Sequence, residues 1–254
     1  MNKWDAWKPY RPGKTDSTRI SRGKLDLFTE CQRCFYLDRR LGIKRPSMPG
    51  WSLNSAVDAL LKNEFDYYRE KQQPHPLMKE YAINAVPLHH ENLSEWRDDV
   101  YQFIGARYLH KPTNLEICGI VDDIWVNHDG DFIIVDYKST STKKELSLDD
   151  EYKQGYKKQA EIYQWIFRQN GFKVTNKCYF VFANGVKDKS MFDSQLEFEM
   201  SILEHNGDDS WVEKAVFNIK SCLDNEKIPE SSPECEHCRF SQLSNKAVGV
   251  NNCD

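Results

Sequence analysis

The chain has 254 residues, a formal net charge of -4 and a mean hydropathy of -0.73, values typical of a globular protein with one sizeable core. No apolar run approaches the roughly 18 residues of a membrane span, and the first residues lack the apolar segment of a secretory signal. We therefore expect a cytoplasmic protein without a membrane partner. The net charge does not indicate nucleic-acid binding, which local basic patches decide.

The first predicted elements follow an extended, polar arm at residues 1–20. Helical periodicity predicts a helix over residues 22–41 and a second, amphipathic helix over residues 53–70. The apolar face of the second helix is expected to consist of Val57, Leu60, Leu61, Phe65 and Tyr68. Weak alternation predicts a strand within residues 81–88, and residues 93–105 favour a short helix.

The remaining elements alternate between strand and helix. Residues 116–139 are typical of a β-hairpin, and residues 151–170 of a helix that leads to an apolar strand at residues 176–183. Two strands joined through a helix predict a βαβ crossover. An edge strand is expected at residues 195–200 and a helix at residues 208–224.

Charged side chains follow directly on the buried strand predicted at residues 132–135. Asp136 and Lys138 are two residues apart, so they share one face of that strand. Asp122 lies on the preceding strand of the hairpin. Two carboxylates and a lysine on one face suit a hard divalent cation and a nearby anion. An ordinary salt bridge at a strand end is the alternative.

The length of the hairpin loop decides whether Asp122 joins this group. A three-residue loop that ends in Gly130, with the glycine in the left-handed conformation, pairs Asn127 with Asp131. Counting five residues from each of these places Asp122 opposite Asp136. A two-residue loop would shift the register by one and separate the two carboxylates.

Two CxxC pairs lie near opposite ends of the chain. The four thiols belong to Cys31, Cys34, Cys235 and Cys238. Four thiolates in two pairs are typical of a tetrahedral zinc site or an iron–sulfur cluster, and either would staple the N- and C-terminal segments together. The alternative is that these are ordinary buried apolar cysteines.

Polar side chains share one face of the helix predicted at residues 151–170. Gln159 and Tyr163 are four residues apart, and Tyr156 lies one turn earlier. Lys157 and Lys158 flank this face. Because a helix that packs on a sheet must satisfy its polar groups, phosphates, bases or a metal site are candidate partners. A plain helix surface is the alternative.

Three short motifs lie in order on the hairpin and this helix: Gly119-x-x-Asp122, Asp136-x-Lys138 and Gln159-x-x-x-Tyr163. Together they resemble the PD-(D/E)XK nuclease superfamily, and within it the RecB-like exonuclease branch that includes the CRISPR-associated adaptation nucleases. The stretch CQRCFYLDRRLG also resembles the first helix of that branch. The resemblance covers about residues 20–240.

The resemblance implies an α/β, restriction-endonuclease-like fold: a central mixed β-sheet flanked by helices, with the N- and C-terminal segments clasped by a four-cysteine metal site. In these terms the chain consists of the arm at residues 1–20, a single nuclease-like domain at residues 21–240 that includes the clasp, and a tail at residues 241–254.

Two positions depart from the branch. Its histidine ligand on an early helix corresponds here to Asp58, a carboxylate that can also hold Mg²⁺ or Mn²⁺. Iron–sulfur members usually place one cysteine near the N-terminus and three near the C-terminus, whereas this chain has two and two, with Ser244 where a third would stand. The resemblance therefore favours a [4Fe–4S] cluster and the spacing favours Zn²⁺.

The resemblance implies a divalent-metal-dependent deoxyribonuclease, an exonuclease that prefers single-stranded DNA. Mg²⁺ or Mn²⁺ would be held by Asp58, Asp122, Asp136 and the Tyr137 carbonyl. Lys138 would assist the attacking water, and Gln159 and Tyr163 would position the strand. The expected DNA-binding residues are Tyr156, Lys157, Lys158, Lys143 and Lys144.

The expected partners are DNA and a helicase or another recombination or repair protein. The alternative function is a nuclease-fold DNA-binding or assembly module with little or no cleavage, and the absence of the usual histidine motivates it.

Overall fold

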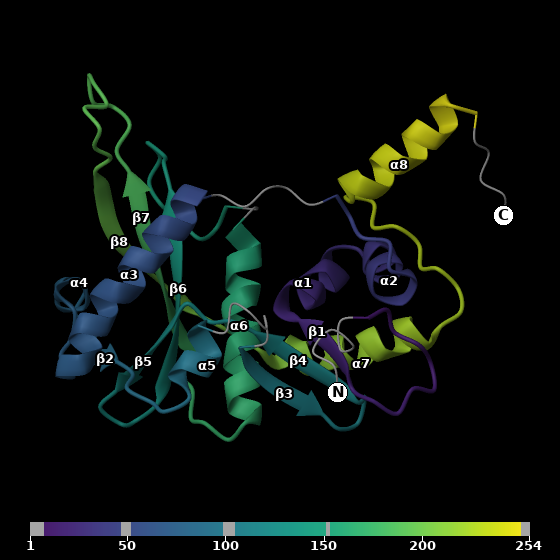
Figure 1. Ribbon diagram of the computed structural model, residues 1–254, viewed down its shortest axis with the longest axis horizontal. Coiled ribbons are helices and arrows are strands. Elements are labelled where there is room, and N and C mark those ends of the chain that lie inside the picture. The colour runs from purple at the N-terminus through teal and green to yellow at the C-terminus, as the bar shows by residue number, and fades with distance from the viewer. Residues whose placement is uncertain (1–7, 47–51, 99–104, 151–152, 250–254) are drawn as a thin grey trace. The chain divides into compact units, whose positions relative to one another are not determined.

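The computed structural model describes residues 8–46, 52–98, 105–150 and 153–249. These residues divide into two compact units. Figure 1 labels their helices and strands. The larger unit consists of the described residues of Pro49–Tyr108 and Cys118–Ser210. The smaller unit consists of the described residues of Met1–Met48, Leu109–Ile117 and Trp211–Asp254.

A mixed five-stranded sheet forms the centre of the larger unit, counted over its described residues. In spatial order its strands are β2 (Ala85–Pro87), β5 (Asp123–Asn127), β6 (Phe132–Thr140), β7 (Lys177–Gly185) and β8 (Phe198–Asn206). Strands β6 and β7 are parallel, and the other neighbours are antiparallel. The prediction of an α/β fold with a central mixed sheet and helices is therefore confirmed.

Helices lie on both faces of this sheet. They are α3 (Ser52–Lys71), α4 (Pro76–Glu80), α5 (Leu93–Asp98) and α6 (Gln154–Gln169). Helix α6 connects β6 to the parallel strand β7, as the predicted crossover requires. Phe65 of α3 packs against Tyr137 of β6, with ring centroids 5.5 Å apart, whereas Gln159 of α6 contacts Asp136. Alternate residues of β6 thus face different helices.

The apolar core on the α3 side is built from strand residues and two helices. It includes Leu61, Phe65, Met78, Trp125, Ile133, Val135, Val181 and Ile202. Phe65 and Trp125 are fully buried, and their rings stack with centroids 5.5 Å apart. The predicted amphipathic helix is therefore present, but Leu60 was wrongly assigned to its apolar face, because its side chain is 67% exposed.

A buried ionic network ties α3 and α5 to the sheet. Arg69 donates a hydrogen bond from Nη2 to Asp123 at 2.6 Å, and the Tyr137 hydroxyl donates to the other oxygen of Asp123 at 2.8 Å. Asp66 accepts from Arg69 at 2.9 Å and from both terminal nitrogens of Arg97 at 2.6 and 2.9 Å. Asp123 is fully buried, so these bonds replace the water it has lost.

The smaller unit contains the ends of the described chain. Its elements are β1 (Thr18–Ser21), α1 (Arg22–Glu30), α2 (Gln32–Leu41), α7 (Ser210–Asp224) and α8 (Glu236–Ala247). Strands β3 (Ala106–His110) and β4 (Leu115–Gly119) continue the chain from one unit into the other, and β1, β4 and β3 form a sheet in that order. None of the helices in the described residues combines the length and apolarity that a membrane crossing requires.

The helix predicted at residues 22–41 is in fact two helices. Cys31 separates them in an extended conformation, with φ -156° and ψ 106°, and acts as the C-cap of α1 and the N-cap of α2. Helical periodicity could not show this break, because the apolar spacing continues across it. The interruption turns the Cys31 thiol toward the other cysteines described below.

Several predicted boundaries also differ. The strand expected within residues 81–88 is the short β2, and the edge strand β8 is longer than expected. Four elements were not predicted: β1, which lies at the end of the expected arm, α4, β3 and α8. The expected helices at residues 93–105 and 151–170 correspond to α5 and α6. Residues 99–104 and 151–152 of these helices, 1–7 of the arm and 250–254 of the tail lie outside the described residues.

Replacement of Arg69 by methionine should destabilise the protein by about 3 kcal/mol, because it leaves the Asp123 carboxylate buried without its cationic partner. Arg107→Met is the matched control: its ion pair with Glu95 is exposed, at 46% and 48% for the two side chains, and we expect a change below about 0.5 kcal/mol. Urea unfolding measures both. Equal effects of the two substitutions would contradict a stabilising role for the network.

Candidate functional site

The hairpin between β5 and β6 has the predicted three-residue loop. The Asn127 amide donates to the Asp131 carbonyl at 3.1 Å, and Gly130 has a φ of 80°. Strand pairing in the same register continues to the first residue of β5. The predicted loop and its register are therefore confirmed, and Asp122, which directly precedes β5, is the next residue in that register toward Asp136.

A hydrogen bond holds Asp122 beside the charged end of β6. Its Oδ2 accepts from the Tyr137 amide at 2.9 Å, and Tyr137 lies between Asp136 and Lys138. Burial and the charge of Asp136 raise the pKa of Asp122 to about 7, although Lys138 opposes this effect. A bound cation beside Asp122 would favour its ionised form.

Asp136 is the most enclosed member of the group, with 1% of its surface exposed. Its Oδ1 accepts a hydrogen bond from Gln159 Nε2 at 2.6 Å, and its Oδ2 forms an ion pair with Lys138. Burial lowers the pKa of Lys138, but the charges of Asp136 and Asp122 outweigh burial and raise it. The ammonium group therefore stays charged, 4.7 Å from the centre of the Tyr156 ring.

Asp58 approaches the same group from α3. Burial, followed by the charge of Asp122, raises the pKa of Asp58, while Lys62 and Lys138 lower it. Its Oδ2 forms an ion pair with Lys62 at 3.0 Å. The structure thus brings three carboxylates and two lysines within electrostatic reach of one another. Lys62 was not predicted, although its position four residues after Asp58 is the spacing of a helical ion pair.

Tyr163 supports the segment that carries Asp122. Its hydroxyl donates to the Ile120 carbonyl at 2.6 Å, and the side chain is 2% exposed. Gln159 is also buried, with its amide directed to Asp136. Both side chains therefore contact the chain around the carboxylates, and the Q-x-x-x-Y spacing places them there from successive turns of α6.

The backbone at Gly119 of the G-x-x-D motif closely approaches Gly105. Gly105 pairs with Gly119 in an isolated bridge, and a Cβ on Gly105 would lie 2.3 Å from the Gly119 carbonyl oxygen. Gly105 also has a φ of 61°, a conformation that favours glycine. Sequence reasoning missed Gly105, because its partner is distant along the chain.

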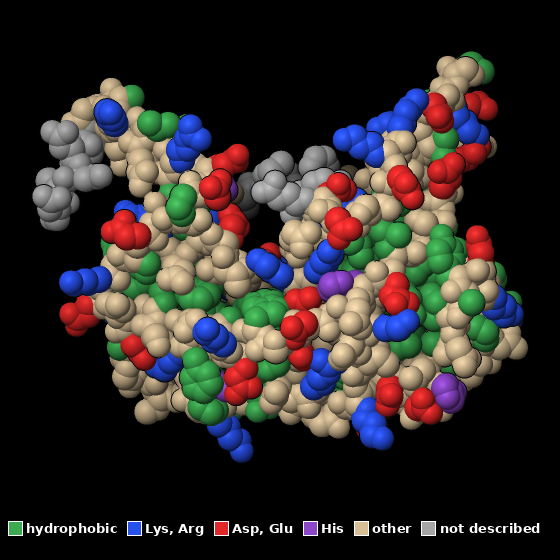
Figure 2. All heavy atoms as spheres, turned by 180° about the vertical axis from the view of Figure 1, so that it is seen from behind, with side chains coloured by type: hydrophobic (Ala, Val, Ile, Leu, Met, Phe, Trp, Pro, Cys, Tyr) green, Lys and Arg blue, Asp and Glu red, His purple; other side chains and the backbone are tan. Residues whose placement is uncertain are grey.

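The predicted DNA-binding lysines lie in two places. Lys157 and Lys158 are on α6, where Lys157 pairs with Asp149 at 2.9 Å. Lys143 and Lys144 are exposed in the loop after β6. On the face drawn in Figure 2, lysine and arginine side chains are interspersed with acidic ones and do not form one continuous basic surface.

The smaller unit holds the four predicted cysteines together. All four are buried, and their sulfur atoms lie within 4.8 Å of one another. The Sγ of Cys34 lies 3.4 Å from that of Cys238 and 3.6 Å from that of Cys235. These separations are too long for a disulfide bond, which is about 2 Å, but suit four thiolates around a metal. The four cysteines from the N- and C-terminal segments therefore form a possible metal site, whose donor set fits zinc and iron–sulfur chemistry.

Polar groups contact two of these sulfurs, whereas burial raises the pKa of Cys34 and of Cys238. Arg45 Nη2 donates to Cys235 Sγ at 3.2 Å, while its Nη1 pairs with Glu30 at 2.7 Å. Burial raises the pKa of Cys31, but hydrogen bonds from the backbone of Cys34 and Ser232 outweigh it and lower the pKa to about 7. Arg45 was not predicted as part of this site, although it belongs to a short basic run next to Pro46.

The family match agrees with the sequence motifs. A family profile described as the PD-(D/E)XK nuclease superfamily matches residues 19–243. The crystal structure of SSO0001 aligns with 92% of this chain and 87% of its own, with 16% sequence identity and a TM-score of 0.38. None of the curated proteins matches the chain.

Cys238→Ser should abolish metal retention, because it removes one of the four grouped thiols. Cys222→Ser, on α7 in the same unit, is the control and should retain the wild-type metal content. Zinc and iron are measured after anaerobic purification, and a brown protein would identify iron–sulfur. If the Cys238 variant kept its metal, the clasp would be excluded as the binding site.

The pKa of Asp122 gives the metal-free protein a pH-dependent stability. Between about pH 4 and about pH 7 the folded state keeps a proton on Asp122 that the unfolded chain releases, so rising pH lowers the free energy of unfolding. Above about pH 7 this contribution levels off. Asp122→Asn should remove it, so the difference in stability between variant and wild type should change across this interval in urea titrations with a chelator. Parallel pH profiles would show that Asp122 titrates normally.

Proposed function

Because the chain belongs to the PD-(D/E)XK nuclease superfamily, we propose that it hydrolyses phosphodiester bonds of DNA with Mg²⁺ or Mn²⁺. The observation that carries the proposal is the placement of Asp122, Asp136 and Lys138 at one end of the hairpin, on the α6 side of the sheet. A purely structural salt bridge would need one carboxylate, whereas a second one raises the electrostatic cost unless a cation is bound.

The donor set fits a hard divalent cation. Asp122 and Asp136 would hold it, with Asp58 as a third carboxylate from α3. The Tyr137 amide points to Asp122, and the carbonyl of a strand residue points to the same side as its amide. The Tyr137 carbonyl therefore supplies a further oxygen. A bound Mg²⁺ or Mn²⁺ would polarise the scissile phosphate and lower the pKa of a coordinated water.

Lys138 supplies a positively charged side chain to the site, in addition to the metal ion. Its ammonium group stays protonated beside Asp136, so it can orient the attacking water and stabilise the negative charge that develops on the phosphate oxygens. Gln159 keeps Asp136 in position, and Tyr163 keeps the Asp122 segment in position. In this proposal Gln159 and Tyr163, the Q-x-x-x-Y residues, act mainly by keeping Asp136 and the Asp122 segment in position. Gln159 would also lie next to the bound DNA strand.

The order of the three motifs supports membership of the RecB-like branch, and we propose an exonuclease that prefers single-stranded DNA. A single strand needs only local neutralisation of its phosphates and an aromatic surface for its bases. Tyr156 stands next to Lys138 and supplies such a surface. Lys157, Lys158, Lys143 and Lys144 would contact the backbone on either side. A helicase or another repair protein would supply the strand.

In this proposal the four-cysteine site is structural and holds Zn²⁺ or a [4Fe–4S] cluster, which clasps the chain segments of the smaller unit. Its four thiolates would leave a net negative charge around either metal group, and Arg45 reduces that charge through Cys235.

A DNA-binding or assembly module without cleavage is the second candidate. The observation that favours it is the pairing of Asp58 with Lys62, which engages one of the three carboxylates in the position of the family's histidine. Binding of DNA with no product in Mg²⁺ or Mn²⁺ would support this alternative.

Lys138→Met should lower the rate of DNA cleavage by about 100-fold or more, the size expected when one group that stabilises transition-state charge is removed. Asp136→Asn should also abolish cleavage. Lys177→Met is the control, because Lys177 pairs with Glu204 on an exposed part of β7. The assay uses end-labelled single- and double-stranded DNA with Mg²⁺ or Mn²⁺. Wild-type rates in both site variants would contradict the proposed nuclease.

A further inference from the structure

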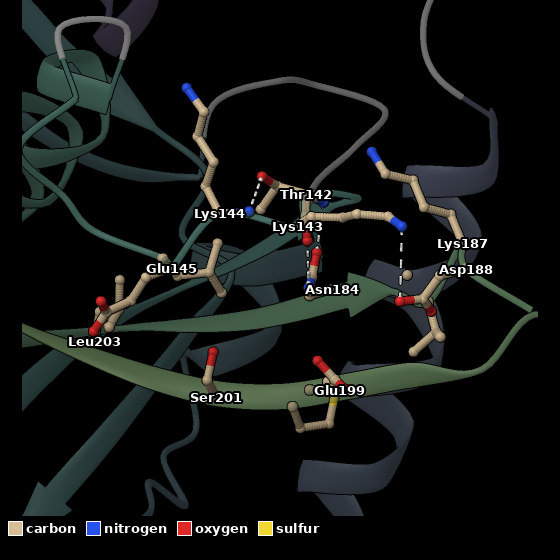
Figure 3. Close-up of a pocket in the computed structure, with 14 residues that line it drawn as sticks. Thr142, Lys143, Lys144, Glu145, Asn184, Lys187, Asp188, Glu199, Ser201 and Leu203 are labelled. Atoms are coloured by element: carbon tan, nitrogen blue, oxygen red, sulfur yellow. Dashed lines mark hydrogen bonds and ion pairs between the residues drawn. The ribbon is translucent and has the colours of Figure 1, made fainter.

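The larger unit has a concave region outside the residues of the proposed nuclease site. It is a cavity of about 720 Å³ between the loop after β6, the end of β7 and the edge strand β8 (Figure 3). Its polar and charged lining includes Thr142, Lys143, Lys144, Asn184, Glu199 and Ser201. Of these, the function proposed above uses only the two lysines.

The register of the sheet places this cavity on the face that carries Asp136 and Lys138. Lys138 pairs with Phe182, and Phe182 pairs with Ser201 of β8. Paired residues of neighbouring strands point to the same face of a sheet, so Ser201 shares the face of Lys138. Glu199, two residues from Ser201 on the same strand, does so as well.

The cavity is also close to the nuclease site along the chain. Thr142 follows Lys138 by four residues, the last two beyond the end of β6, so their backbones are at most about 13 Å apart at roughly 3.3 Å per strand residue. Phosphates in one strand of B-form DNA are about 3.4 Å apart along the axis. A strand whose phosphate lies at Lys138 would therefore reach the cavity within about four nucleotides.

Hydrogen bonds hold the wall of the cavity in place. The Thr142 amide donates to Asn184 Oδ1 at 2.9 Å, and Asn184 Nδ2 donates to the Thr142 carbonyl at 3.1 Å. Ser141 Oγ donates to the Gly185 carbonyl at 2.9 Å, and Lys187 Nζ to the Ser141 carbonyl at 2.7 Å. The loop after β6 is thus fastened to the end of β7, and the cavity is preformed.

The floor of the cavity presents unused hydrogen-bonding groups. Ser201 Oγ is buried and has no hydrogen-bond partner among the described residues. In Figure 3 the Ser201 and Glu199 side chains rise from the same side of β8, toward Asn184 and Thr142. Glu199 is exposed, so its carboxylate is available as an acceptor. A ligand with a polar edge would satisfy both groups.

The charges of the lining indicate the class of ligand. Three lysines, at positions 143, 144 and 187, are balanced by Glu145, Asp188 and Glu199. A site for a bare phosphate would carry an excess of positive charge, whereas a nucleotide presents a phosphate at one end and hydrogen-bond donors at the other. Leu146, Val186 and Leu203 add apolar surface for a base.

We propose that this cavity is a base-reading subsite for single-stranded DNA. Glu199 accepts a hydrogen bond from the exocyclic amino group of cytosine, Ser201 Oγ bonds to the same base edge, and Lys144 contacts the phosphate. Thymine carries a carbonyl oxygen in place of that amino group, so the Glu199 carboxylate repels it. The choice of DNA as the ligand rests on the proposed function, but the subsite itself does not require cleavage.

The test is equilibrium binding of fluorescent oligodeoxycytidine and oligothymidine of equal length, measured by anisotropy with a chelator so that no metal-dependent cleavage occurs. The wild-type protein should bind the cytosine strand about fivefold or more tightly than the thymine strand, the discrimination of one good base contact. Glu199→Gln should abolish this preference, because an amide can donate to thymine as well as accept from cytosine. Ser201→Ala should reduce it.

Two further variants separate base reading from general effects. Lys144→Met should weaken binding of both strands equally, because phosphate contacts carry no base information. Glu204→Gln, on the opposite face of β8, should leave the preference unchanged. Equal affinity of the wild type for the two strands, or a preference that survives Glu199→Gln, would overturn the subsite.

The same measurement distinguishes this inference from the nuclease proposal. DNA cleavage in Mg²⁺ or Mn²⁺ without a Glu199-dependent base preference would overturn the subsite and leave the nuclease. A Glu199-dependent preference without cleavage would support the subsite and contradict the nuclease. Absence of binding to either strand would overturn the subsite.

Discussion

The register of one hairpin determines where the charges of the larger unit lie. Because side chains alternate along a strand, the three-residue loop that ends in Gly130 places Asp122 and Asp136 on one face. The same alternation sends Asp123 and Tyr137 to the other face, where they meet Arg69. A shift by one residue would exchange these two sets, leaving the proposed metal site without Asp122 and the core with an unpaired charge.

The carboxylates on the two faces of the hairpin are neutralised to different extents. On the α3 face, the charge of Asp123 is balanced within the protein by Arg69 and the Tyr137 hydroxyl. On the α6 face, burial and then the charge of Asp136 raise the pKa of Asp122 to about 7, although Lys138 and, from α3, Lys62 oppose them. A fold that neutralises one aspartate and leaves its neighbour under-compensated is well arranged to bind an external cation.

Sequence reasoning succeeded where short-range geometry determines the outcome. The hairpin register followed from the position of Gly130 between two apolar runs, and the crossover through α6 followed from the order of strand and helix. It failed where the outcome depends on distant partners. The break at Cys31 serves the cysteine group, and Leu60 is exposed although its spacing fits the apolar face of α3.

The charged residues that sequence reasoning missed were missed for the same reason, because their partners are distant along the chain. Arg69 looks like an ordinary helix-surface residue until Asp123, more than 50 residues away, is placed beside it. In the same way, nothing in the sequence around Arg45 indicates its contact with Cys235, which is distant along the chain. Buried ion pairs between distant residues leave no periodic pattern, and neither does a cavity such as the one beside β8, whose wall depends on the contact between Asn184 and Thr142.

The central claim is that Asp122 and Asp136 together hold one divalent ion. Binding of Mn²⁺ to the purified protein, followed by electron paramagnetic resonance, tests it without any substrate. The wild type and Asp129→Asn, an exposed loop variant, should bind Mn²⁺ alike, while Asp122→Asn and Asp136→Asn should each lose most of the affinity. Unchanged Mn²⁺ binding in either of the last two variants would contradict the account.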